Sequence, residues 1–238
     1  MPQPRIIVTA SRGQDRTEYL DALREAGAEP VRLEPGAAAE RALDGAAGLL
    51  VTGGVDVDPA AYGAPASPHV TEVEPERDLL EIELLRSARE RGMPTLCICR
   101  GLQIANVAFG GSLIADIPAA LGSLATIPHE VGVDDGRVVR GLIAQHVVAV
   151  EPQSRLARIL GATSVVTGSR HHQSADRCAE ELRVVARTDD GIVEALEARF
   201  TSPFWLAVQW HPESTRTLDL GASRTIFASF VNATARSR

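Results

Sequence analysis

The order of apolar segments in the first hundred residues is the feature that most restricts the fold of this chain. The pattern predicts strands over 5–10, 30–33, 48–51 and 94–98, with helices over 16–26, 37–43 and 77–91 between them. Residues 55–75 show no periodicity and are predicted to form a surface loop. Strands that alternate with helices in this way form a mostly parallel open sheet of the α/β class, with helices on both faces.

The second half of the chain predicts a smaller antiparallel addition to this α/β sheet. Residues 110–145 are rich in Gly and Pro and poorly patterned. Strands are predicted over 146–150, 164–167, 182–187, 192–196 and 205–209, with a turn at 189–191 that makes a hairpin, and a closing helix over 219–230. The 238 residues carry no repeat or linker. We therefore expect one domain over 1–238.

Composition excludes several classes of protein. The net charge is −7 and the pI is about 5.4, which argues against a nucleic-acid partner. All 24 basic residues are arginine. Without a lysine the chain cannot form a Schiff base, attach pyridoxal phosphate or build a P-loop. The expected partner is a small molecule.

The same sequence predicts a soluble, cytoplasmic protein. No apolar run approaches the roughly 20 residues of a membrane span, and the N-terminus lacks a signal segment. Three cysteines do not make a disulfide framework. Cys97 and Cys99 have no further metal ligands at suitable spacing, so neither a metal nor a cofactor is predicted. A homodimer is compatible with the sequence, which does not fix the oligomeric state.

Cys99 is the candidate nucleophile. It follows a predicted buried strand and precedes a segment of helical composition that starts at Arg100. A thiol at a helix N-terminus is stabilised as the thiolate. A sharp strand-to-helix corner needs small residues on both sides, a requirement that Gly101 meets and Cys97 meets partly. The alternative is that both cysteines are small core residues, which is the usual role of free cysteine.

His211 and Glu213 are the candidate base and its orienting carboxylate. They follow the strand at 205–209, and in extended backbone a spacing of two puts both side chains on one side. A carboxylate on one imidazole nitrogen fixes the tautomer while the other nitrogen faces the thiol. A solvated strand end is the alternative interpretation.

The run Thr52-Gly53-Gly54 follows a strand that should lie beside the cysteine strand. Backbone amides there can point at a developing oxyanion because glycine has no side chain. We expect the amides of Gly54 and Arg100 to form an oxyanion hole. The alternative is a simple glycine turn.

Four polar residues are candidates for substrate binding. Gln103 lies one helical turn after Cys99, and His171, His172 and Gln173 form a loop after a predicted strand. The alternative for His171 and His172 is that they are surface loop histidines that do not contact substrate. His69, His129 and His146 receive no functional assignment.

Together these motifs resemble the class I glutamine amidotransferase-like (flavodoxin-like) superfamily, and within it the γ-glutamyl-γ-aminobutyrate hydrolase family of polyamine breakdown. The resembling stretches occur in family order: 52–57 with Pro59 and Tyr62-Gly63; Arg77-Asp78 with Glu81; 98–103 with Asn106-Val107 and 110–113; 171–173; 190–195; and 208–213. The chain differs at Cys97, where the family usually has Gly, and at 167–170.

The resemblance implies a triad of Cys99, His211 and Glu213, with Gly54 and Arg100 as oxyanion donors. The expected reaction is hydrolysis of a γ-glutamyl amine to glutamate and free amine through a γ-glutamyl thioester. Two rivals stay open. One is a glutaminase subunit that supplies ammonia to a synthase. The other is a catalytically silent relative with a binding or regulatory role.

Overall fold

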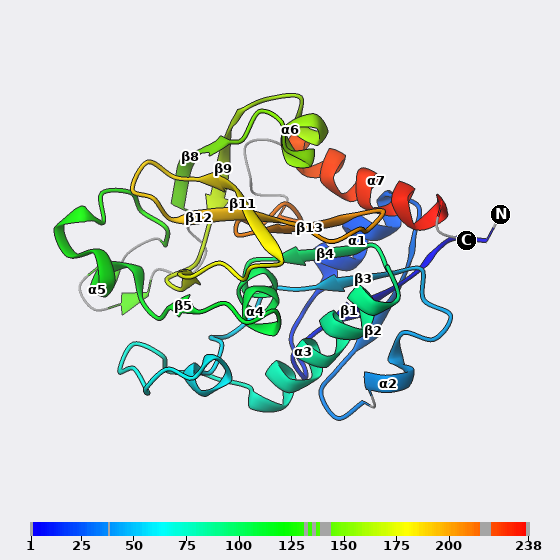
Figure 1. Ribbon diagram of the computed structural model, residues 1–238, viewed down its shortest axis with the longest axis horizontal. Coiled ribbons are helices and arrows are strands. Elements are labelled where there is room, and N and C mark those ends of the chain that lie inside the picture. Colours follow the sequence, from blue (N-terminus) through cyan, green and yellow to red (C-terminus); the bar gives the residue numbers. More distant parts are fainter. Residues whose placement is uncertain are drawn as a thin grey trace.

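The computed structural model describes residues 2–37, 39–130, 133–134, 137–138, 144–214 and 220–236. Its centre is a nine-stranded sheet in the order β2-β1-β3-β4-β13-β12-β11-β8-β9 (Figure 1). The strands are β1 Arg5–Thr9, β2 Glu29–Leu33, β3 Gly48–Val51, β4 Thr95–Ile98, β8 Ala144–Val150, β9 Ser164–Ser169, β11 Leu182–Arg187, β12 Val193–Ala198 and β13 Trp205–Val208.

The first five strands of that order are parallel, as the sequence predicts. Strand β4 lies between β3 and β13, with Leu96 paired to Leu50 on one side and Leu206 on the other. All residues of β3, β4 and β13 are buried. Because parallel strands end at the same edge of a sheet, the residues after Val51, Ile98 and Val208 are brought together.

The sheet becomes antiparallel beyond β13. Strands β13 and β12, β12 and β11, β11 and β8, and β8 and β9 all pair antiparallel. This confirms the predicted antiparallel addition and shows that it continues the main sheet. Two short antiparallel pairs stand apart, β5 (Leu113–Ile114) with β10 (Ser174–Ala175), and β6 (Val133–Asp134) with β7 (Arg137–Val138).

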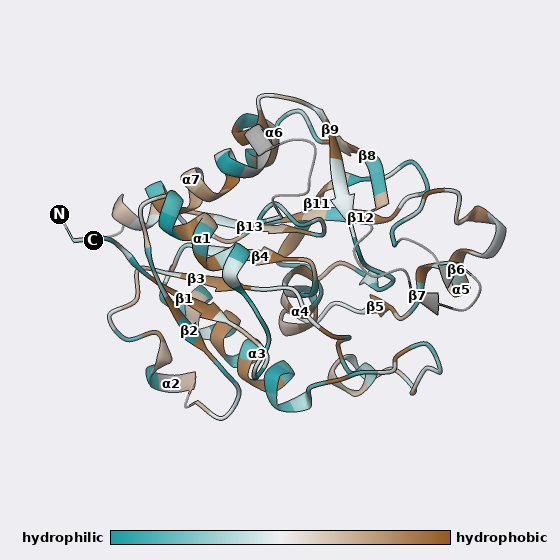
Figure 2. Ribbon diagram, turned by 180° about the vertical axis from the view of Figure 1, so that it is seen from behind, coloured by the Kyte–Doolittle hydropathy of each residue, from teal (hydrophilic) through white to brown (hydrophobic). Residues whose placement is uncertain are grey.

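Helices cover both faces of the sheet, as predicted. One core joins the strands to α2 (Ala39–Ala42), α3 (Pro75–Glu90) and α4 (Arg100–Ala108). The other joins the opposite face to α1 (Thr17–Glu25), α6 (Arg155–Leu160) and α7 (Leu220–Arg236). Figure 2 shows that α1 and α3 each carry both hydrophobic and hydrophilic residues, as expected of helices with one buried side.

Some local predictions are wrong. The predicted loop over 55–75 contains the 3-10 helix η1 (Pro59–Tyr62), which Asp58 caps by accepting a hydrogen bond from Ala60 N. The poorly patterned segment contains α5 (Ile117–Leu121) and η2 (Gly122–Leu124), and α6 is not predicted at all. These elements have one or two turns, too few for an apolar period to show. Residue 219 of the predicted closing helix lies outside the described residues, and α7 runs on to Arg236.

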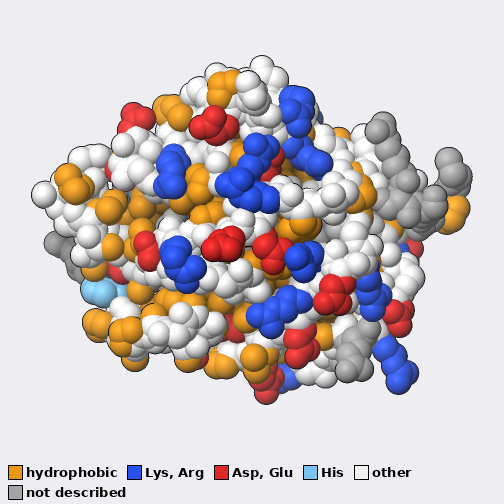
Figure 3. All heavy atoms as spheres, in the orientation of Figure 1, with side chains coloured by type: hydrophobic (Ala, Val, Ile, Leu, Met, Phe, Trp, Pro, Cys, Tyr) orange, Lys and Arg blue, Asp and Glu red, His pale blue; other side chains and the backbone are white. Residues whose placement is uncertain are grey.

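The face of the molecule seen in Figure 3 carries arginine and acidic side chains mixed together, with apolar side chains between them. Such interspersed charge gives no single-sign field of the kind that recruits nucleic acid. Within the described residues, no helix combines the length and apolarity needed to cross a bilayer.

Candidate active site

Cys99 lies at a strained corner between β4 and α4. Its φ of 55° and ψ of −111° make it the one non-glycine residue with a positive φ in the described part of the chain. Its N–H donates to the carbonyl of Val208 at the end of β13. Strain of this kind persists only where the surrounding structure holds it, and it is typical of a nucleophile elbow.

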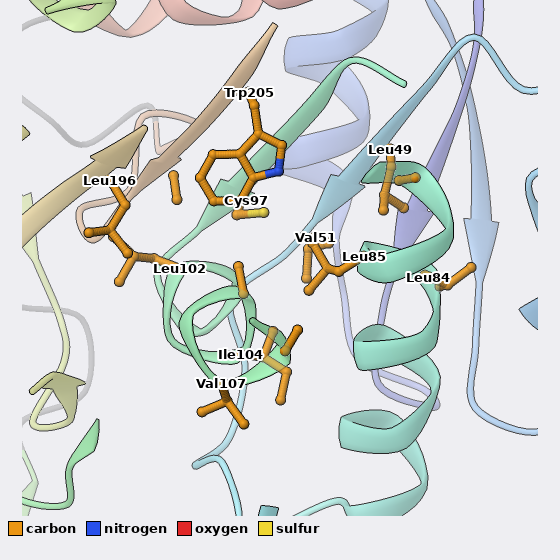
Figure 4. Close-up of a cluster of buried hydrophobic side chains, with 14 of the residues drawn as sticks. Leu49, Val51, Leu84, Leu85, Cys97, Leu102, Ile104, Val107, Leu196 and Trp205 are labelled. Carbon is orange, nitrogen blue, oxygen red and sulfur yellow. The ribbon is translucent and has the colours of Figure 1, made fainter. Parts of the chain in front are cut away.

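Cys97 has a different environment, although it is only two residues away. It is fully buried in β4, pairs with Ala207 of β13 and belongs to the core that contains Trp205 (Figure 4). Burial raises the pKa of the Cys97 thiol well above its usual value. A protonated, inaccessible thiol cannot act as a nucleophile, so the geometry separates the two cysteines.

Two glycines permit close approaches at this corner. A Cβ on Gly101 would overlap the carbonyl oxygen of Val51 in β3, so the corner requires glycine two residues after Cys99. A Cβ on Gly54 would overlap the guanidinium of Arg77. The predicted need for small residues at the elbow is met at Gly101, while Cys97 is accommodated because its side chain points into the core.

His211 and Glu213 follow β13 and are buried next to Cys99. His211 Nδ1 lies 2.6 Å from Glu213 Oε1. The chain turns over 212–213 and is not extended as the sequence pattern suggests, but the two side chains still meet. His211 and Cys99 line the same cavity and both lie beside Gly53, where a Cβ would stand 3.2 Å from His211 Cε1 and 3.6 Å from Cys99 Cβ. The structure thus brings the three predicted triad residues together.

The electrostatics of this group favour a charged imidazole. Burial opposes protonation of His211, but the charges of Glu213 and of the Cys99 thiolate outweigh it and raise the pKa of His211 to about 10. Burial raises and the imidazolium lowers the pKa of Glu213, with a net shift below its usual value. A protonated His211 beside the sulfur is the partner that a thiolate requires.

Tyr19 of α1 links this group to the glycine turn. Its hydroxyl accepts a hydrogen bond from Gly53 N at 3.1 Å and lies 3.4 Å from His211 Nδ1. Burial, and then the charges of Glu213 and Cys99, raise the pKa of Tyr19 well above its usual value, so the phenol stays a donor. Sequence analysis missed Tyr19 because a tyrosine on an apolar helix face gives no signal beyond core packing.

We expect Tyr19→Phe to lower kcat about tenfold with little change in KM, because Gly53 N loses its acceptor and His211 Nδ1 loses the hydroxyl that lies beside it. Steady-state kinetics on a γ-glutamyl amide measures this. Phe keeps the ring that packs against Leu23 and Ile98 in the same core, so the melting temperature serves as the control for folding. An unchanged kcat would exclude a positioning role for the hydroxyl.

A cavity of about 590 Å³ opens over Cys99 and His211. Its lining contains Gly53, Gly54, Glu213, Tyr19 and a mixture of charged groups. Among the latter are Arg16, which donates to the Gly53 carbonyl at 3.0 Å, and Arg170, which is exposed. The thiol is therefore reachable by a small molecule, and the predicted oxyanion donor Gly54 lies at the same cavity.

A network of buried charged side chains supports the turn at Thr52 and Gly53. Arg77 Nη2 donates to the carbonyls of Thr52 at 3.0 Å and Gly53 at 2.9 Å, while Arg77 Nε donates to Glu81 Oε1 at 2.8 Å. Arg100 forms ion pairs with both Glu81 and Asp78. Sequence analysis assigned Arg100 a backbone role only, and the structure adds this anchoring of its side chain.

The four residues predicted to bind substrate are not among the described residues that line this cavity. Gln103 Nε2 donates to the Gln173 carbonyl at 2.9 Å, and Gln173 Oε1 accepts from Val57 N at 3.0 Å. His171 Nε2 lies 3.4 Å from Glu194. That any of the four residues contacts substrate remains a prediction. In the structure, the side chains of Gln103, Gln173 and His171 contact other segments of the chain.

His172 lies between two carboxylates. Its Nε2 is 2.8 Å from Asp56 Oδ1 and its Nδ1 is 3.2 Å from Asp116 Oδ2. The hydrogen bond with Asp56 outweighs burial and raises the pKa of His172 to about 9. The side chain is thus a charged link between the loop after β3 and the cap of α5.

Comparison with known proteins identifies the family. The model of the family described as Peptidase C26 matches residues 7–213, which includes every residue of the group around Cys99. The chain belongs to the peptidase C26 family. This confirms the resemblance to class I glutamine amidotransferase-like proteins that the motifs indicate. As a C26 member, the chain is of the amidotransferase and hydrolase type.

Individual C26 relatives carry two kinds of name. The chain is 36% identical over 228 residues to a γ-glutamyl-γ-aminobutyrate hydrolase of Escherichia coli O157:H7, covering 91% of this chain and 84% of that protein. It is 39% identical over 202 residues to a Mycobacterium tuberculosis protein that is named provisionally as a glutamine amidotransferase. That match covers 83% of this chain and spans 62% of the relative's length.

Solved structures share the C26 fold. The glutaminase domain of a Trypanosoma brucei CTPS with bound acivicin superposes with a TM-score of 0.64 at 20% identity, covering 98% of this chain and 94% of that one. At this level of identity, the similarity supports a shared fold only.

Proposed function

We propose that this protein hydrolyses the γ-glutamyl amide bond of a γ-glutamyl amine, such as γ-glutamyl-γ-aminobutyrate or a γ-glutamyl polyamine. The observation that carries the proposal is the convergence of Cys99, His211 and Glu213 beneath an open cavity, with Cys99 on a strained corner. The likeness to a γ-glutamyl-γ-aminobutyrate hydrolase over 91% of this chain supports the substrate class.

In the first half of the reaction, the Cys99 thiolate attacks the γ-carbonyl carbon of the substrate. The tetrahedral intermediate places its negative charge on the former carbonyl oxygen, where the N–H groups of Gly54 and Arg100 would donate. His211 then gives its proton to the amine nitrogen as the C–N bond breaks. The free amine leaves, and a γ-glutamyl thioester stays on Cys99.

In the second half, water attacks the thioester and the sulfur is the leaving group. Acylation removes the negative charge from Cys99, and that charge is one of the causes of the raised pKa of His211. In the proposed thioester the pKa of His211 is therefore lower, so His211 stays neutral after it has protonated the amine and can take a proton from the attacking water. Glutamate leaves, and the thiolate–imidazolium pair is restored.

The charged cavity suits the glutamyl part of such a substrate. A γ-glutamyl group carries an α-carboxylate and an α-ammonium, and the lining offers the cations Arg16 and Arg170 near the anions Asp15 and Glu18. Carboxylates pair well with guanidinium groups. We propose that the two arginines bind the α-carboxylate of the substrate. The protein would then discriminate less strictly between different leaving amines.

The raised pKa of His211 sets an expected pH profile. With a pKa of about 10, His211 stays protonated at neutral pH and loses its proton as the pH rises through that value. We expect kcat/KM to be nearly flat from neutral pH to about pH 9 and to fall beyond it, because the acid for the leaving amine is lost. Glu213→Gln removes a charge that raises this pKa and should move the alkaline fall to lower pH. A wild-type fall centred near 6.5 would contradict the assignment.

A substrate panel tests the proposed function. The protein is incubated with γ-glutamyl-γ-aminobutyrate, γ-glutamylputrescine, a γ-glutamyl anilide and glutamine, and released glutamate is measured. We expect release from the γ-glutamyl amines, with glutamine the poorer substrate. Release from glutamine alone would favour a glutaminase that supplies ammonia, and release from none would favour a silent relative.

The cysteines fit the proposed location in the cytoplasm. All three, Cys97, Cys99 and Cys178, are free. Cysteines without disulfides are usual in a reducing compartment, which supports the proposed location.

A further inference from the structure

A cluster of three histidines and a glutamate lies in the antiparallel half of the sheet, apart from the cavity over Cys99. His146 is on β8, Glu194 on β12, His171 in the segment after β9 and His129 in the segment after η2. In Figure 1 these strands lie in the half of the sheet far from β2, with β11 between β12 and β8. At most 3% of any of the four side chains is exposed.

The three histidines direct one ring nitrogen each at the same carboxylate oxygen. Glu194 Oε1 lies 3.2 Å from His146 Nε2, 3.4 Å from His129 Nδ1 and 3.4 Å from His171 Nε2. None of the three nitrogens has a hydrogen-bond partner of good geometry, and neither does either oxygen of Glu194. Buried polar atoms in folded proteins nearly always have a hydrogen-bond partner, so five unpartnered atoms in one place require an explanation.

The contact at the opposite nitrogen of each ring fixes which nitrogen carries the proton in the neutral imidazole. His146 Nδ1 lies 3.1 Å from the Pro128 carbonyl, and His171 Nδ1 lies 2.9 Å from the Gln173 carbonyl. His129 Nε2 lies 3.1 Å from Asp190 Oδ2, and Asp190 in turn accepts from Thr188. In a neutral imidazole the nitrogen facing a carbonyl or carboxylate carries the proton. The nitrogens facing Glu194 then present lone pairs.

Lone pairs that converge on a carboxylate repel it unless a cation lies between them. We propose that His129 Nδ1, His146 Nε2 and a Glu194 oxygen, with His171 Nε2 as a fourth donor, bind a divalent transition-metal ion of the Zn²⁺ type. The first three donor atoms lie within 4.8 Å of one another. Donors about 2.0–2.2 Å from a tetrahedral Zn²⁺ stand about 3.3 Å apart, close to the separations from Glu194 Oε1.

The outer contacts of the cluster are those of a metal site. Histidines that bind metals donate their other N–H to a carbonyl or carboxylate, and all three histidines here have such a partner. Imidazole with one carboxylate favours Zn²⁺ and its neighbours over Mg²⁺ or Ca²⁺. Four protein donors leave no open position, which indicates a structural site.

The proposed site would stabilise the antiparallel half of the sheet and its link to the segment after β13. The Glu194 carbonyl accepts a hydrogen bond from Gln209 N, two residues before His211. The His129 carbonyl accepts from His171 N and from Ser169 Oγ. One ion would therefore connect β8, β12 and the segments that contain His129 and His171. The hydrogen bond from Gln209 N to Glu194 links this group to the segment that contains His211.

Metal analysis tests the proposal without using activity. Untagged protein is dialysed against Zn²⁺, passed into metal-free buffer and analysed by mass spectrometry of the element. We expect one Zn²⁺ per chain, and a visible spectrum typical of tetrahedral Co²⁺ after loading with Co²⁺. His146→Ala and Glu194→Gln should lose the ion, whereas His69→Ala, which removes an exposed histidine, should keep it.

A variant that keeps all four ligands guards against loss of folding. Asp190→Asn changes only the group that orients His129, and we expect its affinity for Zn²⁺ to fall about 10- to 100-fold. Chelation should also lower the melting temperature of the wild type, and Zn²⁺ should restore it. The proposal is overturned if the wild type holds no more zinc than His146→Ala, or if Asp190→Asn and the wild type bind Zn²⁺ equally.

Discussion

Cys99→Ala should lose about 10⁴-fold or more in kcat, while Cys97→Ala should lose no more than a few-fold. Loss of a nucleophile that acts with its base as a unit removes nearly all of the chemical acceleration. Cys97 is buried in β4 against the core of Trp205 and has no contact with the cavity. Glutamate release from a γ-glutamyl amide measures both variants under identical conditions.

The pair of variants is matched because each removes one thiol, and the two thiols are two residues apart, one within β4 and one at the corner that follows it. Cys178→Ala is a third control at a half-buried position outside the cavity. The melting temperature of each variant shows that the fold is kept. Retention of a tenth of wild-type activity by Cys99→Ala, or inactivation of well-folded Cys97→Ala, would show that the nucleophile is assigned wrongly.

Arg77→Met should destabilise the protein by about 3–5 kcal/mol, the usual cost of leaving a buried charge without its partner. Arg77 and Glu81 are both fully buried, and their ion pair lies directly under the turn of Thr52 and Gly53. Burial raises and the charges of Arg100 and Arg77 lower the pKa of Glu81, with a net downward shift, so the carboxylate is charged in the folded protein, and Arg100 is the ion-pair partner that it keeps in Arg77→Met. The urea midpoint of unfolding measures the change.

Two further variants show that the effect comes from the buried pair. Arg24→Met removes the exposed ion pair with Asp21, which should contribute less than about 1 kcal/mol. Arg77→Lys should not restore full stability, because an ammonium cannot donate in a planar fork to Glu81 and to two carbonyls at once. A change of under about 1 kcal/mol in Arg77→Met would contradict the account of the network.

The sequence predicts the parallel half of the fold well because each strand of that half is a short apolar run followed by a turn. Val51, Ile98 and Val208 each end such a run, and parallel order then puts Gly54, Cys99 and His211 at one edge. The proximity of the triad candidates therefore follows from topology and needs no knowledge of side-chain packing.

Long-range polar contacts could not be predicted in this way. Tyr19 and Arg77 reach the site from helices on opposite faces of the sheet. Nothing in the sequence distinguishes either residue from a helical Tyr or Arg that has no role in a site. The histidine cluster draws its members from four segments separated by tens of residues. The run of His171, His172 and Gln173 predicts that His171 contacts substrate. In the structure, the ring of His171 faces Glu194. The homodimer with which the sequence is compatible is not tested by the structure of one chain.

Mass spectrometry of acid-quenched protein tests the central claim most directly. The protein is mixed with a γ-glutamyl amine, quenched within one turnover and digested, with Glu213→Gln as a variant that should slow hydrolysis of the thioester. The account predicts one γ-glutamyl group, held as a thioester, on the peptide that contains Cys99. Turnover of substrate with that peptide unmodified, or with the group on another residue, would contradict it.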